Sequence, residues 1–202
     1  MGKVITVTRE FGSMGRLIAR LVAEKLGFNY YDRDIIELAA KEFRGNIDEL
    51  SGFDDKKLSV FGKMMYPLGL GSAAMQSKVY EMEKSVMLDL ARTEDCVIVG
   101  RCSDHLLRTY GHNMDDLLNI FIYAPYEARL TSCKNELNLD EAQAKKYIEG
   151  VDKARREFYK LNTGESFYSR KYRHLMLDSS TVSRDLLVDT IVAIAKERFH
   201  ME

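Results

Sequence analysis

A glycine-containing turn at residues 11–16 has the residue types and spacing to bind phosphate. It reads Phe-Gly-Ser-Met-Gly-Arg and lies between a β-branched run and an apolar pattern with helical spacing that begins at Leu17. The backbone N–H groups of such a turn form an anion site with the N-terminus of the following helix. Two glycines would let the backbone close around phosphate oxygens, and a cation after the second would reach the β- and γ-phosphates. The predicted ATP phosphate ligands are Gly12, Ser13, Met14, Gly15 and Arg16.

The turn departs from the usual phosphate-loop pattern, which is Gly, four residues, Gly-Lys-Ser/Thr. If Gly15 is the second glycine, Glu10 stands where the first is expected. Arg16 replaces the lysine, and Leu17 replaces the hydroxyl that usually holds Mg²⁺. The alternative is a glycine turn that only joins a core strand to a core helix. The rest of the chain must decide between the two.

A basic segment at about residues 150–173 could supply further phosphate ligands. Its cations are Lys153, Arg155, Arg156, Lys160, Arg170, Lys171 and Arg173. An Asn-Thr-Gly break at 162–164 would place them on a hairpin of helix, turn and loop. Arginine binds phosphate through two parallel bonds and is weakly hydrated, so we predict a lid that closes over phosphates. The alternative is a solvated helix face, which is what most charge runs are.

Apolar strands alternate with helices along the whole chain. Strands are expected at 4–8, 28–31, 96–99, 118–124 and 175–178, and helices at 17–26, 32–43, 73–91, 103–110, after Pro125, 140–159 and 186–199. Most of these strands are apolar throughout, which is typical of an α/β fold whose parallel sheet is covered by helices on both faces. Ligands of such sheets bind at the carboxyl ends of the strands. The tips at residues 9–16 and at Gly100-Arg101 should therefore face one crevice.

Residues 45–72 form the least regular stretch, with glycines, one of the two prolines and many apolar residues. A polar linker would not carry Phe61, Met64 or Leu68. We predict a flap or insert that packs on a ligand or on a second copy of the chain in a homodimer. The remaining residues, 1–44 and 73–202, would form the core of a single domain over 1–202.

The composition of the chain limits the kinds of binding partner that we expect. The 202 residues carry a net charge of −1, so no global field attracts nucleic acid or acidic lipid, and we expect neither nucleic acid nor membrane as a partner. The 3 cysteines are an odd number without a C-x-x-C pair, which predicts neither a disulfide framework nor a zinc site. The 4 histidines are scattered, so no protein metal site is predicted. Reduced thiols and the absence of a spanning segment indicate a cytoplasmic protein.

The order and spacing of several motifs resemble nucleoside monophosphate kinases, and most closely the cytidylate kinase-like family. The motifs are Thr8-Arg-Glu-Phe-Gly-Ser-Met-Gly-Arg16, Tyr30-Tyr-Asp-Arg33, Cys96-Val-Ile-Val-Gly-Arg-Cys102, Phe121-Ile-Tyr-Ala124, Asp152-Lys-Ala-Arg-Arg156 and Leu177-Asp-Ser-Ser180. The resemblance covers nearly the whole chain. It implies a P-loop NTPase-type parallel sheet sandwiched by helices, with an arginine-rich lid and a helical insert at 45–72 like the monophosphate-binding insert of these kinases.

The resemblance also implies roles for individual residues. Asp32 and Arg101 match positions that bind the acceptor, and Arg155 and Arg156 match the lid, with Arg170 beside them in the basic segment. Arg16, Arg155 and Arg156 would be the catalytic residues, acting on ATP with Mg²⁺. The position of the acidic residue that selects cytosine corresponds to Tyr123, so a preference for cytosine is not implied.

Three functions are open at this point. The first is transfer of the γ-phosphoryl group of ATP to a nucleoside monophosphate or a similar small phosphorylated acceptor. The second is a nucleotide-binding sensor or regulatory protein without turnover, which the substitution at Leu17 favours. The third is an α/β interaction protein that binds no phosphate.

Overall fold

The structure is a computed structural model that describes residues 1–36 and 73–202. The predicted flap at 45–72 and most of the predicted helix at 32–43 lie outside the described residues. Residues 33–36 are helical, so the start of that helix is where the sequence places it.

Five parallel strands form one sheet in the order β2-β3-β1-β4-β5. Their bounds are Val4–Arg9 for β1, Asn29–Tyr31 for β2, Cys96–Val99 for β3, Leu117–Tyr123 for β4 and Leu175–Asp178 for β5. Strand β1 is central, and Val4 pairs with Cys96 on one side and Leu117 on the other. The predicted parallel sheet is confirmed, and its central strand leads directly into the glycine turn.

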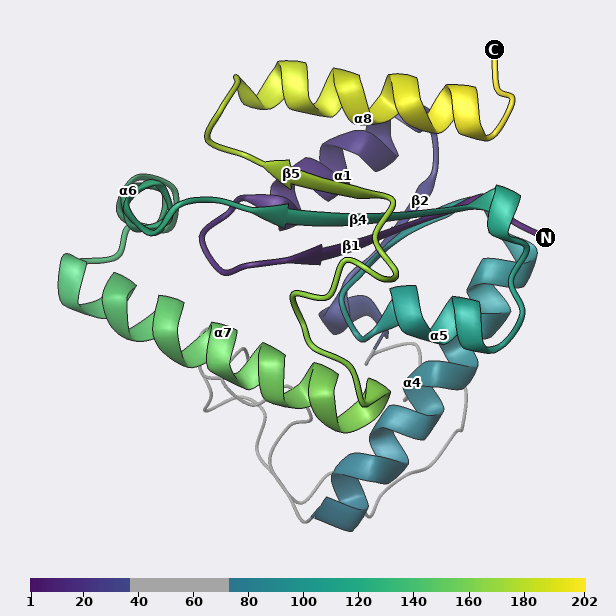
Figure 1. Cartoon of the computed structure of the whole chain (residues 1–202), viewed down its shortest axis with the longest axis horizontal. Helices are drawn as coiled ribbons and strands as arrows, with labels where there is room; N and C mark the ends of the chain where they lie inside the picture. Colours follow the sequence, from purple (N-terminus) through teal and green to yellow (C-terminus); the bar gives the residue numbers. More distant parts are fainter. Residues whose placement is uncertain (37–72) are drawn as a thin grey trace.

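Helices cover both faces of the sheet, as Figure 1 shows. Helices α1 (Gly15–Leu26) and α8 (Arg184–Arg198) lie on one face, whereas α4 (Ala73–Thr93), α5 (Ser103–Thr109) and α7 (Glu141–Thr163) lie on the other. Helix α6 (Tyr126–Leu137) lies beyond the carboxyl ends of the strands, and a short 3₁₀ turn, η3 (Met114–Asp116), precedes β4. The carboxyl edge of the sheet is thus enclosed by α6, α7 and the glycine turn.

The core explains why most strand positions are apolar. Along β1, Ile5 and Val7 pack with α1 and α8, whereas Val4 packs in a second cluster with residues of α4 and α5. Since successive side chains of a strand point to opposite faces, a sheet covered on both sides needs apolar residues at every position. The two buried faces hold the strand tips in fixed register.

Helix α7 is longer than predicted, because it continues to Thr163 rather than stopping near Tyr159. The side chains of Asn162 and Thr163 donate hydrogen bonds back to the carbonyls of Phe158 and Tyr159, which satisfies acceptors in the last turn. Gly164 then ends the helix with a φ of 71°. The whole first half of the basic segment is therefore helical.

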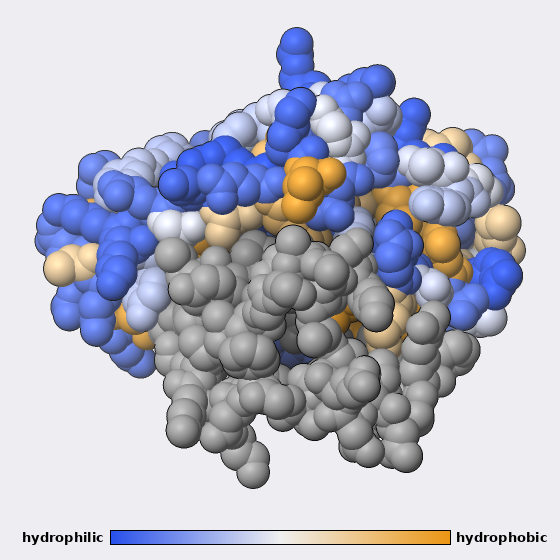
Figure 2. Space-filling model, turned by 90° about the horizontal axis from the view of Figure 1, so that it is seen from below, coloured by the Kyte–Doolittle hydropathy of each residue, from blue (hydrophilic) through white to orange (hydrophobic). Residues whose placement is uncertain are grey.

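The described surface is predominantly hydrophilic when seen from below, with small separate apolar patches (Figure 2). In the described part of the chain, no helix is both long and apolar enough to cross a bilayer.

Candidate phosphate-binding site

The glycine turn presents an open row of backbone donors. No described residue accepts a hydrogen bond from the N–H groups of residues 12–17, which lie at the N-terminus of the 12-residue helix α1. Ser13 turns its hydroxyl inward, where it donates to the carbonyls of Glu10 (2.9 Å) and Ile122 (3.2 Å). Ser179 donates to the carbonyl of Ser13 at 2.8 Å. The loop is thus held from behind while its amides stay available for an anion.

The two glycines of the turn are needed for packing as well as for backbone freedom. A Cβ at Gly12, whose φ is 78°, would lie 2.9 Å from the carbonyl oxygen of Arg129 on α6. A Cβ at Gly15 would lie 2.6 Å from the Cβ of Arg9. Both contacts are too close for a side chain. The turn therefore needs these glycines to sit against α6 and the end of β1.

Arg16, at the position of the usual lysine, pairs with the carboxylate of Asp32 and lies 3.4 Å from that of Asp34. The buried Asp32 also accepts hydrogen bonds from the backbone N–H groups of Asp34 (3.1 Å) and Ile35 (3.3 Å). Asp32 thus caps the helix that begins at residue 33. Its place as an acceptor ligand stays a prediction, and its second oxygen neutralises the loop's arginine.

Helix α7 is joined to the entrance of the loop by a buried polar network. Asp152 accepts the backbone N–H of Phe11 at 2.7 Å and pairs with Arg129 of α6. Arg129 also donates to the carbonyl of Phe11 (3.3 Å), and Arg155 donates to the carbonyl of Arg9 (3.0 Å). Sequence analysis placed Asp152 in a motif but gave it no role, because its partners are distant in sequence.

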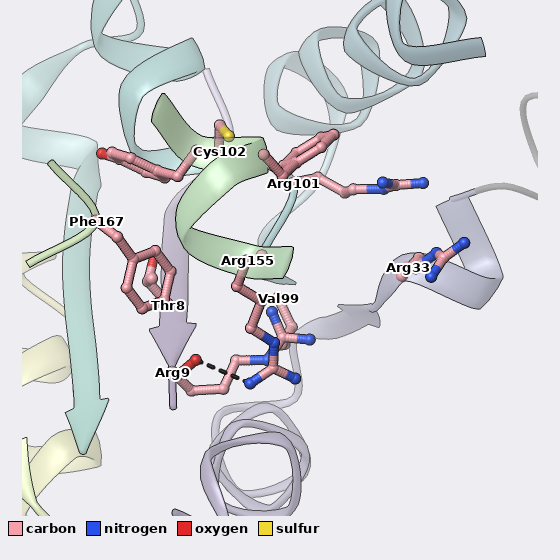
Figure 3. Close-up of a pocket in the computed structure, with 11 residues that line it drawn as sticks. Thr8, Arg9, Arg33, Val99, Arg101, Cys102, Arg155 and Phe167 are labelled. Atoms are coloured by element: carbon pink, nitrogen blue, oxygen red, sulfur yellow. Dashed lines mark hydrogen bonds between the residues drawn. The ribbon is translucent and has the colours of Figure 1, made fainter. Parts of the chain in front are cut away.

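Arg9 is a site residue that sequence analysis missed. It ends the central strand, and its Nε is shielded from solvent without a hydrogen bond to the described residues. Burial, followed by the nearby positive charge of Arg155, holds the pKa of Arg9 well below its usual value. Figure 3 shows the two guanidinium groups side by side. The sequence places Arg9 in the 9–16 tip that is expected to face the crevice, but a strand-end arginine carries no signal that distinguishes a buried ligand from a solvated residue.

The tip of β3 forms a tight turn that contributes a second arginine. Gly100, Arg101 and Cys102 have φ angles of 82°, 55° and 55°, and residues other than glycine adopt such values at a cost of about 1–3 kcal/mol each. The side chain of Arg101 is buried against Glu83 of α4, with which it forms an ion pair, and lies over the ring of Phe158. Such strain is concentrated at functional sites.

Two pockets meet at the carboxyl edge of the sheet. The loop pocket, of about 430 Å³, is lined by the glycine turn together with Arg16, Leu17, Asp32 and Leu137. The arginine pocket lies between the tips of β1 and β3 and is lined by Thr8, Arg33, Gly100, Arg101, Phe158 and Phe167, among others. Of the 9–16 tip, Arg9 shares a pocket with Gly100 and Arg101, and most of the other residues of that tip line the adjoining loop pocket.

The predicted lid arginines lie in different surroundings. Arg155 lines both pockets, and burial lowers its pKa to about 10. Arg156 and Arg170 are exposed and line neither pocket, so their part in a lid stays a prediction. Arg173 is buried, pairs with Asp104 and lies over two aromatic rings, which makes it a structural residue.

The residues around the loop fit Mg²⁺ only as a companion of phosphates. Within residues 1–36 and 73–202 there is no group of three His, Cys, Asp or Glu side chains that could hold a metal. Asp104 is buried with Arg173 and the hydroxyl of Tyr159 (2.9 Å), so it does not face the loop. Asp32 does line the loop pocket. Mg²⁺ is often held by substrate phosphates and one carboxylate, and the carboxylates that line this pocket are those of Glu10, Asp32 and Glu136.

Comparison with known families gives a match to the model of the cytidylate kinase-like family over residues 4–181. The chain belongs to the cytidylate kinase-like family. No curated protein matches it. The match spans the glycine turn, the β3 tip and the whole basic segment, and so contains every motif on which the resemblance was based.

Solved structures with low sequence identity to this cytidylate kinase-like chain share its fold. A protein of uncharacterised function from Eubacterium ventriosum has 18% identity and a TM-score of 0.73, with 96% of this chain and 98% of that chain covered. A sugar kinase from Janibacter sp. has 12% identity and a TM-score of 0.57 (96% and 94% covered). Shikimate kinase from Acinetobacter baumannii has 13% identity and a TM-score of 0.53 (98% and 94% covered). Family and fold together support phosphoryl transfer.

Proposed function

We propose that this protein transfers the γ-phosphoryl group of ATP to a nucleoside monophosphate or a similarly small phosphorylated acceptor. The observation that carries the proposal is the row of open amides at residues 12–17, which faces a pocket that adjoins a second pocket rich in arginine. A kinase needs two such neighbouring sites, one for each substrate.

The loop pocket suits the phosphates of the donor. The amides of residues 12–17 and the N-terminal end of α1 would bind β- and γ-phosphate oxygens. Arg16 would exchange the carboxylate of Asp32 for these oxygens, since it is half-exposed and free to turn. The released Asp32 would then be available to Mg²⁺, which neutralises phosphate charge when it is bound with ATP.

The arginine pocket suits an acceptor that carries a negative group. Arg33 and Arg101 line it, and the aromatic rings of Phe158 and Phe167 supply apolar walls. A planar base against an aromatic ring, with a phosphate held by arginine, is a common arrangement in nucleotide binding. These residues do not determine which base or which sugar the acceptor carries.

Phosphoryl transfer demands positioning and charge neutralisation rather than covalent chemistry by the protein. Arg155 lines both pockets and would stabilise charge on the group in transfer, and Arg156 and Arg170 would join it as lid residues. Removing water from around these groups strengthens each electrostatic contact.

A nucleotide-binding sensor is the second candidate. Two observations favour it: Leu17 lies in the loop pocket where a Mg²⁺-binding hydroxyl is usual, and Arg16 is already neutralised by Asp32. A sensor would use the same loop pocket without turnover.

The test is ADP formation from Mg-ATP with a panel of nucleoside monophosphates, together with direct measurement of ATP binding. A kinase predicts ADP that depends on one acceptor, and Arg16→Ala should reduce the rate. Arg92→Ala, which alters an exposed arginine paired with Asp89 on α4, is the matched control. ATP binding without turnover for any acceptor would favour the sensor, and no ATP binding would exclude both functions.

A further inference from the structure

We propose that Arg9 and Arg155 together form a binding site for the phosphoryl group that passes between the loop pocket and the arginine pocket. This inference rests on the proposed function and adds a ligand-binding residue, Arg9, that neither the motifs nor the fold assign. The ligand class is the terminal phosphate of a nucleoside triphosphate.

Arg9 and Arg155 lie at the boundary between the two pockets. Among the described residues that line the two pockets, Arg9 and Arg155 are the two that line both. A group that leaves a donor in one pocket for an acceptor in the other must pass through the boundary between them. The side chains at that boundary are these two guanidinium groups.

Arg9 and Arg155 place two positive charges next to each other. The two cations lie side by side, and positive charge from Arg155 opposes the protonated form of Arg9 (Figure 3). No described carboxylate forms an ion pair with Arg9, and the Nε of its guanidinium has no hydrogen bond to the described residues. Two adjacent guanidinium groups in a partly buried site repel each other unless an anion lies between them.

The carboxylates around the pair have partners of their own: the negative charge of Asp32 acts on Arg9, but Asp32 pairs with Arg16. Asp152 lies 3.9 Å from Arg155 but accepts the N–H of Phe11 and pairs with Arg129. Glu10 accepts the N–H of Ala124 at 3.3 Å. These groups hold the loop in place, so they cannot move to neutralise Arg9 without breaking the loop's own support. An anionic ligand would neutralise the pair.

Two glycines, Gly15 and Gly100, leave room for the side chain of Arg9 between the tips of β1 and β3. A Cβ at Gly100 would collide with Nη1 of Arg9, and a Cβ at Gly15 would collide with its Cβ. Arg155 is fixed in turn by its hydrogen bond to the carbonyl of Arg9 at 3.0 Å. The guanidinium groups are therefore positioned before any ligand arrives, which lowers the entropy lost on binding.

The test compares the affinity of the whole protein for Mg-ADP and for the non-hydrolysable analogue β,γ-imido-ATP by titration calorimetry. Wild type should bind the analogue more tightly, because the analogue has the terminal phosphate and ADP does not. Arg9→Met should lose about tenfold to hundredfold of that preference, the usual range for hydrogen bonds to a charged group, with ADP affinity within about twofold of wild type.

Arg155→Met should behave like Arg9→Met, and Arg9→Lys should lose part of the preference, because lysine keeps the charge but not the two-pronged donor. Lys153→Met, an exposed position on α7 whose side chain faces Glu157, is the control and should match wild type. If Arg9→Met does not fold, Arg9→Lys and Arg155→Met carry the test.

The outcomes separate this inference from the proposed function. If wild type binds neither nucleotide, the proposed function fails and this inference fails with it. If wild type binds both and forms ADP, but Arg9→Lys and Arg155→Met keep the full preference for the analogue, the arginine pair is refuted and the kinase proposal stands. An equal loss of affinity for both nucleotides would also refute it, because Arg9 would then serve only to shape the loop.

Discussion

Removal of the Asp152 carboxylate should destabilise the whole protein and loosen the phosphate loop. In the structure this carboxylate is 4% exposed, accepts the N–H of Phe11 at 2.7 Å and pairs with Arg129. Asp152→Ala would remove the carboxylate that pairs with the buried guanidinium of Arg129 and accepts the N–H of Phe11, leaving Glu10 at 3.6 Å from Arg129. Breaking a buried ion pair in this way costs about 3–5 kcal/mol. For a chain of this size that is a fall in Tm of about 6–20 °C, at about 2–4 °C for each kcal/mol.

Thermal and denaturant unfolding would measure the loss of stability. Asp152→Asn would separate the part that is due to the hydrogen bond with Phe11 from the part that is due to the charge facing Arg129. The amide oxygen of asparagine can still accept the N–H of Phe11 but brings no negative charge to Arg129, so an intermediate loss is expected. Glu157→Ala is the matched control, because this residue lies on the same helix in an exposed pair, 3.9 Å from Lys153. Exposed pairs contribute about 0–1 kcal/mol, so the control should lose little.

The reasoning would be refuted if Asp152→Ala unfolded within about 2 °C of the Glu157→Ala control, since one kcal/mol corresponds to about that shift. The polar network would then carry no net stability. A large fall in Tm with unchanged affinity for ATP would refute a narrower claim, that the network positions the loop.

Three further predictions concern other parts of the molecule. Gly12→Ala should lower the free energy of unfolding by about 1–3 kcal/mol because of its positive φ, and further because of its contact with the carbonyl of Arg129. Gly111→Ala, with a φ of 79° and nothing within 4 Å of the added Cβ, should lose only the part that is due to the backbone. Urea unfolding of the two variants would show no difference if the contact is unimportant. Stability should fall as the pH drops below about 6.5, because the unfolded chain then binds a proton at His174 more readily than the folded protein does. Burial and nearby positive charge lower the pKa of His174, whose Nδ1 accepts the N–H of Asn119 at 2.9 Å. His174→Asn should flatten that pH dependence, and an unchanged profile would assign it to other groups. Chelation of Mg²⁺ should abolish ADP formation and weaken ATP binding in calorimetry, and turnover that survives chelation would contradict the role given to the ion.

The fold could be predicted because the pattern that encodes it is local. Strands such as Cys96–Val99 are apolar at every position, and this pattern alone distinguishes a sheet covered on both faces from one with a solvated face. The glycine turn and the Gly100-Arg101 tip could be placed in one crevice because parallel strands bring their carboxyl ends to the same edge.

The roles of Arg9, Asp152 and Arg173 could not be predicted, because each depends on contacts between residues far apart in sequence. The carboxylate of Asp152 meets an N–H that is 141 residues away. Arg173 belongs to the basic segment that suggested a lid, yet its side chain is buried with Asp104. The composition of the segment does not indicate that this arginine is buried. Arg9 lies beside a residue that is 146 positions away, Arg155, and an arginine at a strand end usually points to solvent.

The two buried arginines of the basic segment determine where a hinge can lie. Arg155 is fixed to the end of β1 and Arg173 is fixed to α5, and the span between them is also held by Phe158, Tyr159 and Phe167, which are buried in one cluster. A swing of the whole of α7 would have to pull the loop apart, and a bend at Gly164 would have to keep Tyr159 and Phe167 together in that cluster. Arg156 and Arg170 lie on that span, so the distance they can travel is set by its length. If Arg156 and Arg170 act on a phosphate as proposed, their movement is expected to be short, because the span that carries them is anchored at these points.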